Sequence, residues 1–232
     1  QDATFVSLTV NPSGLFHMQN HALSFTSPNA VENQGEIFLL GLESFNNVLN
    51  LDLDSGRVTY MDNDDVYGSG YKTRETFTVH DFGESDFYDL TIYNPSPSAV
   101  PDTYILRSNL RVVKHLSQGI AHLDANGYSV TTGGNYWISN YSSTPIAEEN
   151  RSKFFARTAD HHFQGGMGVG DNADFYGSTG NVTVGTGSGY SGFGISGSSR
   201  FFAPSVLNLN VWNAYFTSTG FDPGTGTVNF GY

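Results

Sequence analysis

Clustered carboxylates are the residues of this chain whose types and spacing could do chemistry. Asp62, Asp64 and Asp65 lie in the octapeptide DNDDVYGS, and Asp171 and Asp174 lie in a near copy, DNADFYGS. Calcium takes several oxygen ligands, and a tight turn ending in glycine can bring such oxygens together. The spacing is not that of an EF-hand, and Asp and Asn also form side-chain turns with their own backbone. These five aspartates are candidate calcium ligands, and no other cofactor is expected.

A second acidic cluster, Glu84, Asp86 and Asp89, raises the question of catalysis. Cleavage of a glycosidic bond needs two carboxylates about 5 to 10 Å apart on one face of the fold. Both clusters fall in apparent turns, and solvated acidic loops are common in a chain whose formal net charge is −12. We therefore expect no catalytic residues and a non-enzymatic protein.

The histidines do not predict a metal site. His161 and His162 are adjacent, so on a strand they point to opposite faces and only one of them could join a given site. His17 and His122 occupy matching places in two similar segments, GLFHMQNHALSFTS (14–27) and GIAHLDANGYSVTT (119–132). This match indicates a structural row of histidines.

The glycine-rich stretch 165–199 also lacks the context of a known site. A phosphate-binding loop needs a helix after it, and no helix pattern follows this stretch. Its aromatic residues, Tyr176, Tyr190 and Phe193, could stack on sugar rings if they are exposed. Glycan binding is therefore an expected use of this surface.

The elements that position these residues are short strands. Residues 87–134 contain three runs in which apolar and polar residues alternate, around Leu90 and Ile92, around Leu110 and Val112, and around Tyr128 and Val130. Alternation with a period of two buries one face of a strand and leaves the other in water. Proline and glycine separate the runs, and there is no room for a helix between them. We expect an all-β protein with little or no helix.

Composition and charge agree with this fold class and exclude several functions. Charged residues make up only 14%, whereas aromatic residues reach 14% and there are 27 glycines. The net charge of −12 disfavours nucleic acid and offers no attraction to an anionic membrane. The absence of cysteine excludes disulfides and thiolate sites. The chain starts at Gln1 without a methionine or signal peptide, which is typical of a processed, exported protein.

Internal similarity predicts repeated units. Besides the pairs already quoted, one signature occurs three times, as SGRVTY (55–60), TGNVTV (179–184) and TGTVNF (225–230). We expect a first unit at 1–96, a second at 97–205 and a truncated third at 206–232, in a longer polypeptide. Such repeats with closely spaced strands predict a β-solenoid, or parallel β-helix, in which each coil buries its apolar face on its neighbours. Two tandem β-sandwiches are the alternative.

Residues 55–134 resemble a known class of repeats. The series SGRVTY, ETFTVHDFGESDFYDLTIYNP and SNLRVVKHLSQGIAHLDANGYSVTTGG is similar to repeats of very large exported surface proteins of Bacteroidota. The flanking segments 31–41 and 221–230 fit this pattern, and 140–205 fits it loosely. The resemblance implies a substrate of the type IX secretion system that serves as an adhesin or stalk, in cell adhesion or gliding motility.

These observations together predict a secreted, cell-surface, adhesive repeat segment without enzymatic activity. Its expected partners are surface glycans or other cell-surface proteins. The alternative is a carbohydrate-active enzyme, either a polysaccharide lyase or a hydrolase, or a glycan-binding module on a β-helix.

Overall fold

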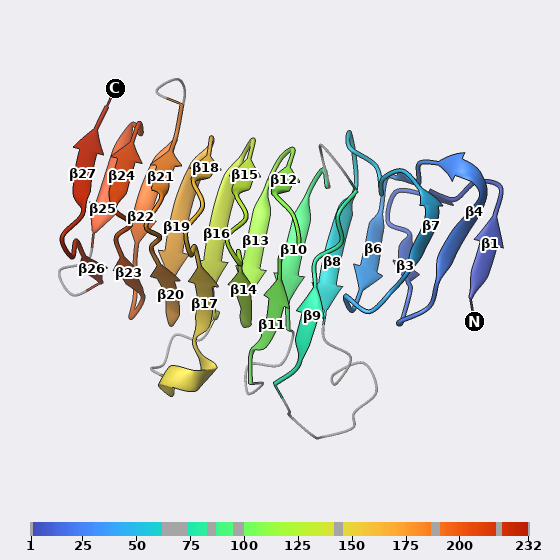
Figure 1. The fold of residues 1–232 in the computed structure, drawn as a ribbon, viewed down its shortest axis with the longest axis horizontal. Coiled ribbons are helices and arrows are strands. Elements are labelled where there is room, and N and C mark those ends of the chain that lie inside the picture. The colour runs from blue at the N-terminus through green and yellow to red at the C-terminus, as the bar shows by residue number, and fades with distance from the viewer. Residues whose placement is uncertain are drawn as a thin grey trace.

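The chain folds as a parallel β-solenoid, which confirms the predicted fold class. The structure is a computed structural model and describes residues 2–61, 74–82, 87–94, 100–141, 146–186, 191–216 and 220–231. Its strands stack side by side along the long axis of the molecule, with the N-terminus at one end and the C-terminus at the other (Figure 1). Every strand pairing among the described residues is parallel, in three long sheets and two short ones.

The strands of the described residues fall into five sheets. The nine-stranded sheet contains β3 (Leu15–His17), β6 (Glu36–Leu39), β8 (Arg57–Met61), β10 (Leu90–Tyr93), β13 (Leu116–Gly119), β16 (Asn135–Ser139), β19 (Gly166–Gly170), β22 (Gly192–Ile195) and β25 (Asn213–Phe216). The seven-stranded sheet contains β9 (Thr76–Thr78), β11 (Asp102–Ile105), β14 (Ala121–Asp124), β17 (Ser152–Phe155), β20 (Ala173–Tyr176), β23 (Arg200–Phe202) and β26 (Phe221–Asp222). The six-stranded sheet contains β12 (Leu110–Val112), β15 (Val130–Thr132), β18 (His161–Phe163), β21 (Asn181–Val184), β24 (Val206–Leu209) and β27 (Thr227–Phe230). The first coils add β1 (Ala3–Phe5), β4 (Leu23–Asn29) and β7 (Phe45–Val48) in one sheet, and β2 (Thr9–Val10) and β5 (Glu32–Asn33) in another.

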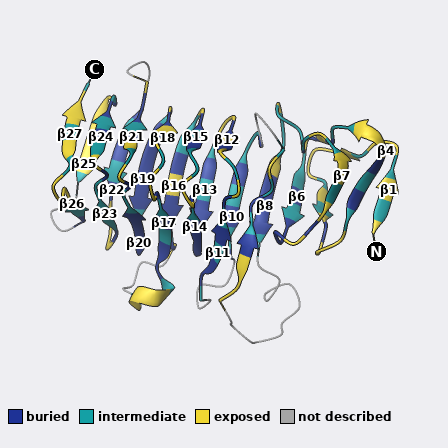
Figure 2. Cartoon of the chain, viewed as in Figure 1, coloured by how far each residue is buried: buried dark blue, intermediate teal, exposed yellow. Residues whose placement is uncertain are grey.

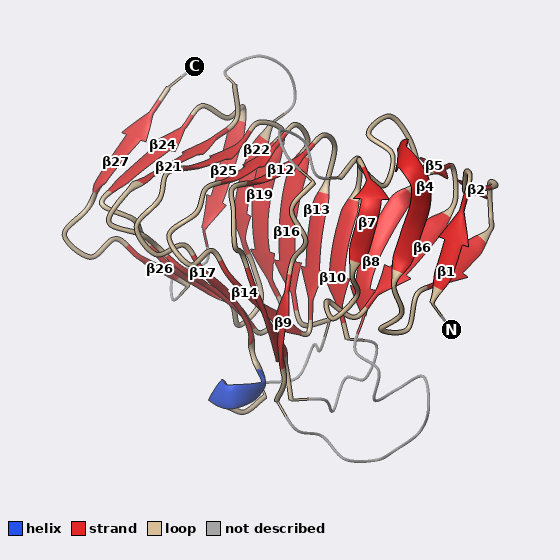
Figure 3. Cartoon of the chain, turned by 45° about the vertical axis from the view of Figure 1, so that its right-hand side comes forward, coloured by secondary structure: helices blue, strands red, loops and turns tan. Residues whose placement is uncertain are grey.

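One coil is the repeating unit of the structure. From β10 onward the chain visits the nine-, seven- and six-stranded sheets in turn and then returns to the first. Partners on neighbouring coils lie from 19 residues apart (Asp102 and Ala121) to 32 residues apart (Val58 and Leu90). The strands stay in register from coil to coil although the coils differ in length (Figure 3).

The core is a set of apolar rows that run along the axis. Figure 2 shows buried residues on strand after strand through the middle coils. In the seven-stranded sheet one inward row is in register across all seven strands: Phe77, Tyr104, Leu123, Phe154, Phe175, Phe201 and Phe221. The rings of Phe175 and Phe201 are nearly parallel, with centroids 4.5 Å apart. Each aromatic residue is therefore covered by its counterparts on the neighbouring coils, as the sequence analysis predicts for a solenoid.

Tight corners join the sheets. Ile120 alone separates β13 from β14, and its backbone is left-handed, with φ of 49°. At the corner between the six- and nine-stranded sheets, a Cβ atom on Gly133 would come 2.1 Å from the carbonyl oxygen of Val113. The only helix among the described residues is a short 3₁₀ turn, η1 (Glu148–Asn150), which precedes β17. None of the described residues form a helix long and apolar enough to cross a membrane.

Two expectations are wrong. The tandem β-sandwich alternative fails because a sandwich of that type is antiparallel, whereas all described pairings here are parallel. The equivalence of His17 and His122 also fails: His17 is exposed in β3 of the nine-stranded sheet, whereas His122 is buried in β14 of the seven-stranded sheet.

The predicted units 1–96, 97–205 and 206–232 stay a prediction about the sequence. Strand pairing runs across both boundaries, from β10 to β13 and from β21 to β24. The signatures SGRVTY and TGNVTV also lie on different sheets, in β8 and β21. A recurring segment in this chain therefore predicts a strand, but it does not predict the sheet to which that strand belongs.

Candidate functional site

The predicted calcium ligands are separated by the structure. Asp62, Asp64 and Asp65 lie outside the described residues. Asp171 is an exposed turn residue with φ of 38°, whereas Asp174, three residues later in β20, is fully buried. No group of three or more His, Asp or Glu side chains among the described residues is arranged to hold a metal ion.

Asp174 belongs to a buried ion-pair network that was not predicted from the sequence. Arg151 donates hydrogen bonds from Nε to both carboxylate oxygens of Asp174, each at 2.9 Å, and from Nη2 to Oδ1 at 2.6 Å. Arg200 binds the same carboxylate, with a contact of 2.9 Å from Nε to Oδ1. Two guanidinium groups thus occupy both oxygens of Asp174, which leaves this carboxylate poorly suited to a cation.

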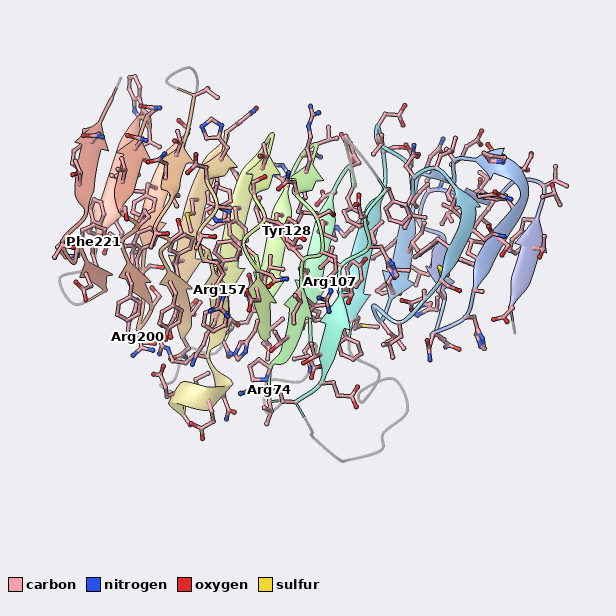
Figure 4. The ribbon with its side chains drawn as sticks, in the orientation of Figure 1. Arg74, Arg107, Tyr128, Arg157, Arg200 and Phe221 are labelled. Atoms are coloured by element: carbon pink, nitrogen blue, oxygen red, sulfur yellow. The ribbon has the colours of Figure 1, made fainter. Side chains whose placement is uncertain are left out.

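The segment around η1 extends this network over the outer face of the seven-stranded sheet. Glu148 accepts hydrogen bonds at 2.6 Å from Arg200, and its Oε1 lies 3.3 Å from Nζ of Lys153. Arg74 donates a hydrogen bond to the carbonyl oxygen of Glu149 at 2.7 Å. Arg74 and Arg200 flank η1 in Figure 4. This outer face is closed by interactions within the chain.

The charges of the network shift two pKa values in the expected directions. Partial burial would raise the pKa of Glu148, but the hydrogen bonds and charges of Arg200 and Lys153 outweigh it and lower the pKa. The carboxylates of Asp174 and Glu148 raise the pKa of Arg200 above its ordinary value. Glu148 and Arg200 are therefore both ionised near neutral pH, and they form an ion pair that holds the segment around η1 to the sheet and not an acid–base pair.

The two adjacent histidines point to opposite faces, as predicted. His161 is buried: its Nδ1 accepts a hydrogen bond from the backbone N–H of Val130 at 3.1 Å, and its Nε2 donates one to the carbonyl oxygen of Ala156 at 2.8 Å. Burial lowers the pKa of His161, so its neutral form is favoured. His162 is exposed on the outer face of the six-stranded sheet.

The aromatic residues of the glycine-rich stretch are less available than a sugar platform requires. Phe193 is buried, and Tyr190 lies outside the described residues. Tyr176 is sandwiched between Phe155 and Phe202, with ring centroids 5.2 and 4.9 Å apart and interplanar angles of 16° and 13°. Because these rings cover one another's faces, they present mainly their edges to solvent. A sugar ring stacks on the face of an aromatic ring, so this stack is a poor sugar-binding platform.

Of the second acidic cluster, the structure describes Asp89, and Glu84 and Asp86 lie outside the described residues. Asp89 lines an open depression of about 340 Å³ together with Glu36, Arg57, Tyr88 and Lys114. Burial raises the pKa of Asp89; Arg57 and Lys114 oppose this shift, and Glu36 adds to it. A carboxyl group with a shifted pKa in a depression, such as that of Asp89, marks a candidate active site.

Glu36, Arg57 and Lys114 were not singled out from the sequence. They lie on three different coils, so their proximity could be predicted only if the lengths of those coils were known. Glu36 and Arg57 are register partners on β6 and β8, and Asp89 directly precedes β10. Glu36 and Asp89 are thus two strand steps apart, or about 9–10 Å along the axis.

A second depression, of about 500 Å³, lies on the outer face of the six-stranded sheet. The residues that line it are all hydrophilic: Ser129, Thr131, Asp160, His161, His162, Asn181, Thr183 and Asn208. Of these residues, the sequence motifs had drawn attention only to the two histidines. Comparison of the chain with protein-family models, with curated proteins and with solved structures finds no match.

Proposed function

We propose that this chain is a non-enzymatic, load-bearing and adhesive repeat segment of a secreted cell-surface protein. The observation that carries the proposal is the continuity of the parallel ladders along the axis, from β3 to β25, from β9 to β26 and from β12 to β27. A load along the axis is shared by the ladders of each coil, and the apolar rows resist bending because they are closely packed.

Composition and resemblance support the cellular setting. A scaffold that works outside the cell without disulfides must obtain its rigidity from ladders and packing, and this chain has no cysteine. Its similarity to repeats of exported Bacteroidota surface proteins favours type IX secretion and a role in attachment or gliding. Surface glycans and other surface proteins are the partners that this role requires.

Single-molecule pulling tests the mechanical part of the proposal. The protein is held through handles at residues 2 and 231 and stretched at constant speed. We expect successive force peaks, each releasing the chain length of one or a few coils, because each coil is held mainly by its neighbours. Smooth extension without peaks would contradict a load-bearing role.

A second candidate function, a carbohydrate-active enzyme, is favoured by one observation, the depression that holds Glu36 and Asp89. Their separation of about two strand steps is close to the carboxylate spacing of inverting glycosidases. A carboxyl group with a raised pKa, such as that of Asp89, suits the acid, and Glu36 suits the base.

Incubation with neutral and acidic polysaccharides separates the two functions. The scaffold proposal expects no release of reducing or unsaturated ends. If products do appear, the enzyme proposal expects Asp89→Asn and Glu36→Gln to abolish them, whereas Glu75→Gln, at an exposed site directly before β9 of the seven-stranded sheet, leaves them unchanged. Products that persist in both variants would contradict the assignment of this depression.

A further inference from the structure

The outer face of the six-stranded sheet carries a row of polar side chains in strict register. Thr131 of β15 is paired with His162 of β18, His162 with Thr183 of β21, and Thr183 with Asn208 of β24. These four residues lie in the depression of about 500 Å³ described above. Parallel pairing fixes their spacing at about 4.8 Å per coil, so the depression presents one hydrogen-bonding side chain at each step along the axis.

The row is preorganised. Thr, Asn and His side chains are short, and their backbones are held in ladders on both sides, so little conformational entropy is lost when a ligand binds. Asn208 is further oriented by hydrogen bonds: its Nδ2 donates to Oγ1 of Thr183 at 3.3 Å, and its Oδ1 accepts from Asn229 at 2.9 Å.

Much of the hydrogen-bonding capacity of the depression is free. The side chains of Ser129, Thr131 and His162 make no hydrogen bond to another described residue, and Asp160 uses only Oδ1, which accepts the backbone N–H of Asn181 at 2.7 Å. The outer face of the seven-stranded sheet differs, because the Arg151–Asp174–Arg200 network and the stacked rings occupy it. The outer face of the six-stranded sheet is therefore the polar surface on which hydrogen-bonding groups remain available to a ligand.

The charge of the depression selects the class of ligand. Its lining contains one carboxylate, Asp160, and no lysine or arginine, in a chain of net charge −12. A polyanion would be repelled, and an apolar ligand would find no apolar side chain to cover. A neutral polyhydroxylated chain offers alternating donors and acceptors at regular spacing, which matches a row of hydroxyl, imidazole and amide groups.

We infer that this depression binds a neutral oligosaccharide that lies along the solenoid axis, one sugar unit per coil. The inference rests on the proposed adhesive function and names its recognition surface and its ligand class. Each hydrogen bond contributes modestly, so the affinity of one depression is low and rises with the number of coils contacted.

Titration of the ¹⁵N-labelled protein with cellohexaose, laminarihexaose, mannohexaose and maltohexaose tests the inference, with hexagalacturonate as the charged comparison. We expect at least one neutral hexamer to shift amide resonances of β15, β18, β21 and β24, to bind more tightly than its dimer, and to bind more tightly than the anionic hexamer. No binding by any neutral hexamer, shifts confined to another sheet, or preference for the anionic hexamer would overturn the inference.

Variants locate the site. Thr183→Val removes one hydroxyl at nearly constant volume and is expected to weaken binding about 3- to 10-fold, the equivalent of one hydrogen bond. Thr183→Tyr fills the depression and is expected to abolish binding. Thr91→Val makes the same change on β10, in the nine-stranded sheet, and is expected to leave binding unchanged. Equal effects of Thr183→Val and Thr91→Val would contradict the assignment.

The outcome is separable from that of the proposed function. A protein that shows stepwise force peaks but binds no neutral hexamer keeps its load-bearing role and loses this site. A protein that binds a hexamer at β15–β24 but extends smoothly keeps the site and loses the load-bearing role.

Discussion

Asp174 is a buried charged residue whose environment requires its negative charge. Its side chain is fully buried between the guanidinium groups of Arg151, itself 8% exposed, and Arg200. Breaking a buried pair by removing one charge leaves the partner uncompensated in a medium of low polarity. Asp174→Asn is therefore expected to lower the free energy of unfolding by about 3–5 kcal/mol, as measured by chemical denaturation.

The matched control is a pair of the same types at the surface. Arg157 binds Asp124 at 2.6 Å, but its side chain is 51% exposed. Asp124→Asn is expected to cost no more than about 1 kcal/mol. Equal losses in the two variants would show that burial does not govern the Asp174 pair.

His122 makes stability depend on pH. Burial, followed by the positive charge of Arg74, lowers the pKa of His122 from 6.5 to about 4. Because the folded-state pKa is the lower one, the unfolded chain binds the proton more tightly, and stability is complete above pH 6.5 and lost as the pH falls toward 4. We expect a loss of about 2 kcal/mol between pH 6.5 and pH 5 from this group.

Thermal or chemical denaturation across that range measures the effect. His122→Gln keeps a donor for the carbonyl oxygen of Arg151, which accepts from Nε2 of His122 at 3.1 Å, but cannot be protonated. The variant should show a flatter pH dependence than the wild type, and His161, whose pKa burial also lowers, contributes to what remains. An unchanged slope would mean that His122 is not the titrating group.

At the residue scale, the sequence predicted only some of the side-chain environments. The recurrence DNAD pointed to Asp174 as a residue worth attention, but a carboxylate becomes a metal ligand or an ion-pair partner according to what faces it. Arg151 and Arg200 face it from neighbouring coils, and the lengths of those coils depend on loops that no local pattern encodes. The opposite orientation of His161 and His162 needed only the period of a strand and was predicted correctly.

At the scale of elements, the corners limit which residues the coil accepts. Gly133 lies between β15 and β16, where an added Cβ would meet the fixed carbonyl oxygen of Val113 at 2.1 Å. Gly133→Ala is expected to destabilise the protein by about 3 kcal/mol, because backbone must move to relieve the contact. Gly194→Ala in β22 is the control, since nothing lies within 4 Å of its added Cβ and a smaller unfolded-state entropy makes it neutral or stabilising.

Denaturation midpoints of the two alanine variants check this prediction. A loss at Gly194 as large as that at Gly133 would contradict the steric explanation.

Local alternation also predicted the strands well. Leu90 and Ile92 are buried in β10, and Leu110 and Val112 are buried in β12, as their period indicates. The sheet to which a strand belongs was not predictable in the same way, as His17 and His122 show. The coils differ in length by up to 13 residues, between 19 and 32, so similarity over a fixed shift does not place two segments on the same sheet.

At the scale of the whole molecule, the solenoid is close to a one-dimensional object. Each coil packs on the coil before it and the coil after it, and the inward row of the seven-stranded sheet is an unbroken example. Stability in such a molecule is approximately a sum of coil terms and nearest-neighbour terms. A local defect should therefore weaken its own coil and the adjacent coils, and its effect should fade along the axis.

Phe175→Ala tests this property. Phe175 is fully buried between Phe154 and Phe201, with ring centroids 5.2 and 4.5 Å away, so truncation removes both stacking contacts and leaves a cavity. We expect a loss of about 3–5 kcal/mol and faster amide exchange in β17, β20 and β23, measured by hydrogen–deuterium exchange. Tyr176→Ala, on the half-buried outer row of the same strand, should cost less, because it opens no interior cavity. Amide exchange in β6 and β8, several coils away, should be unchanged. A uniform increase in exchange along the whole chain would contradict this prediction. It would mean that the coils unfold as one cooperative unit and that nearest-neighbour coupling does not describe this solenoid.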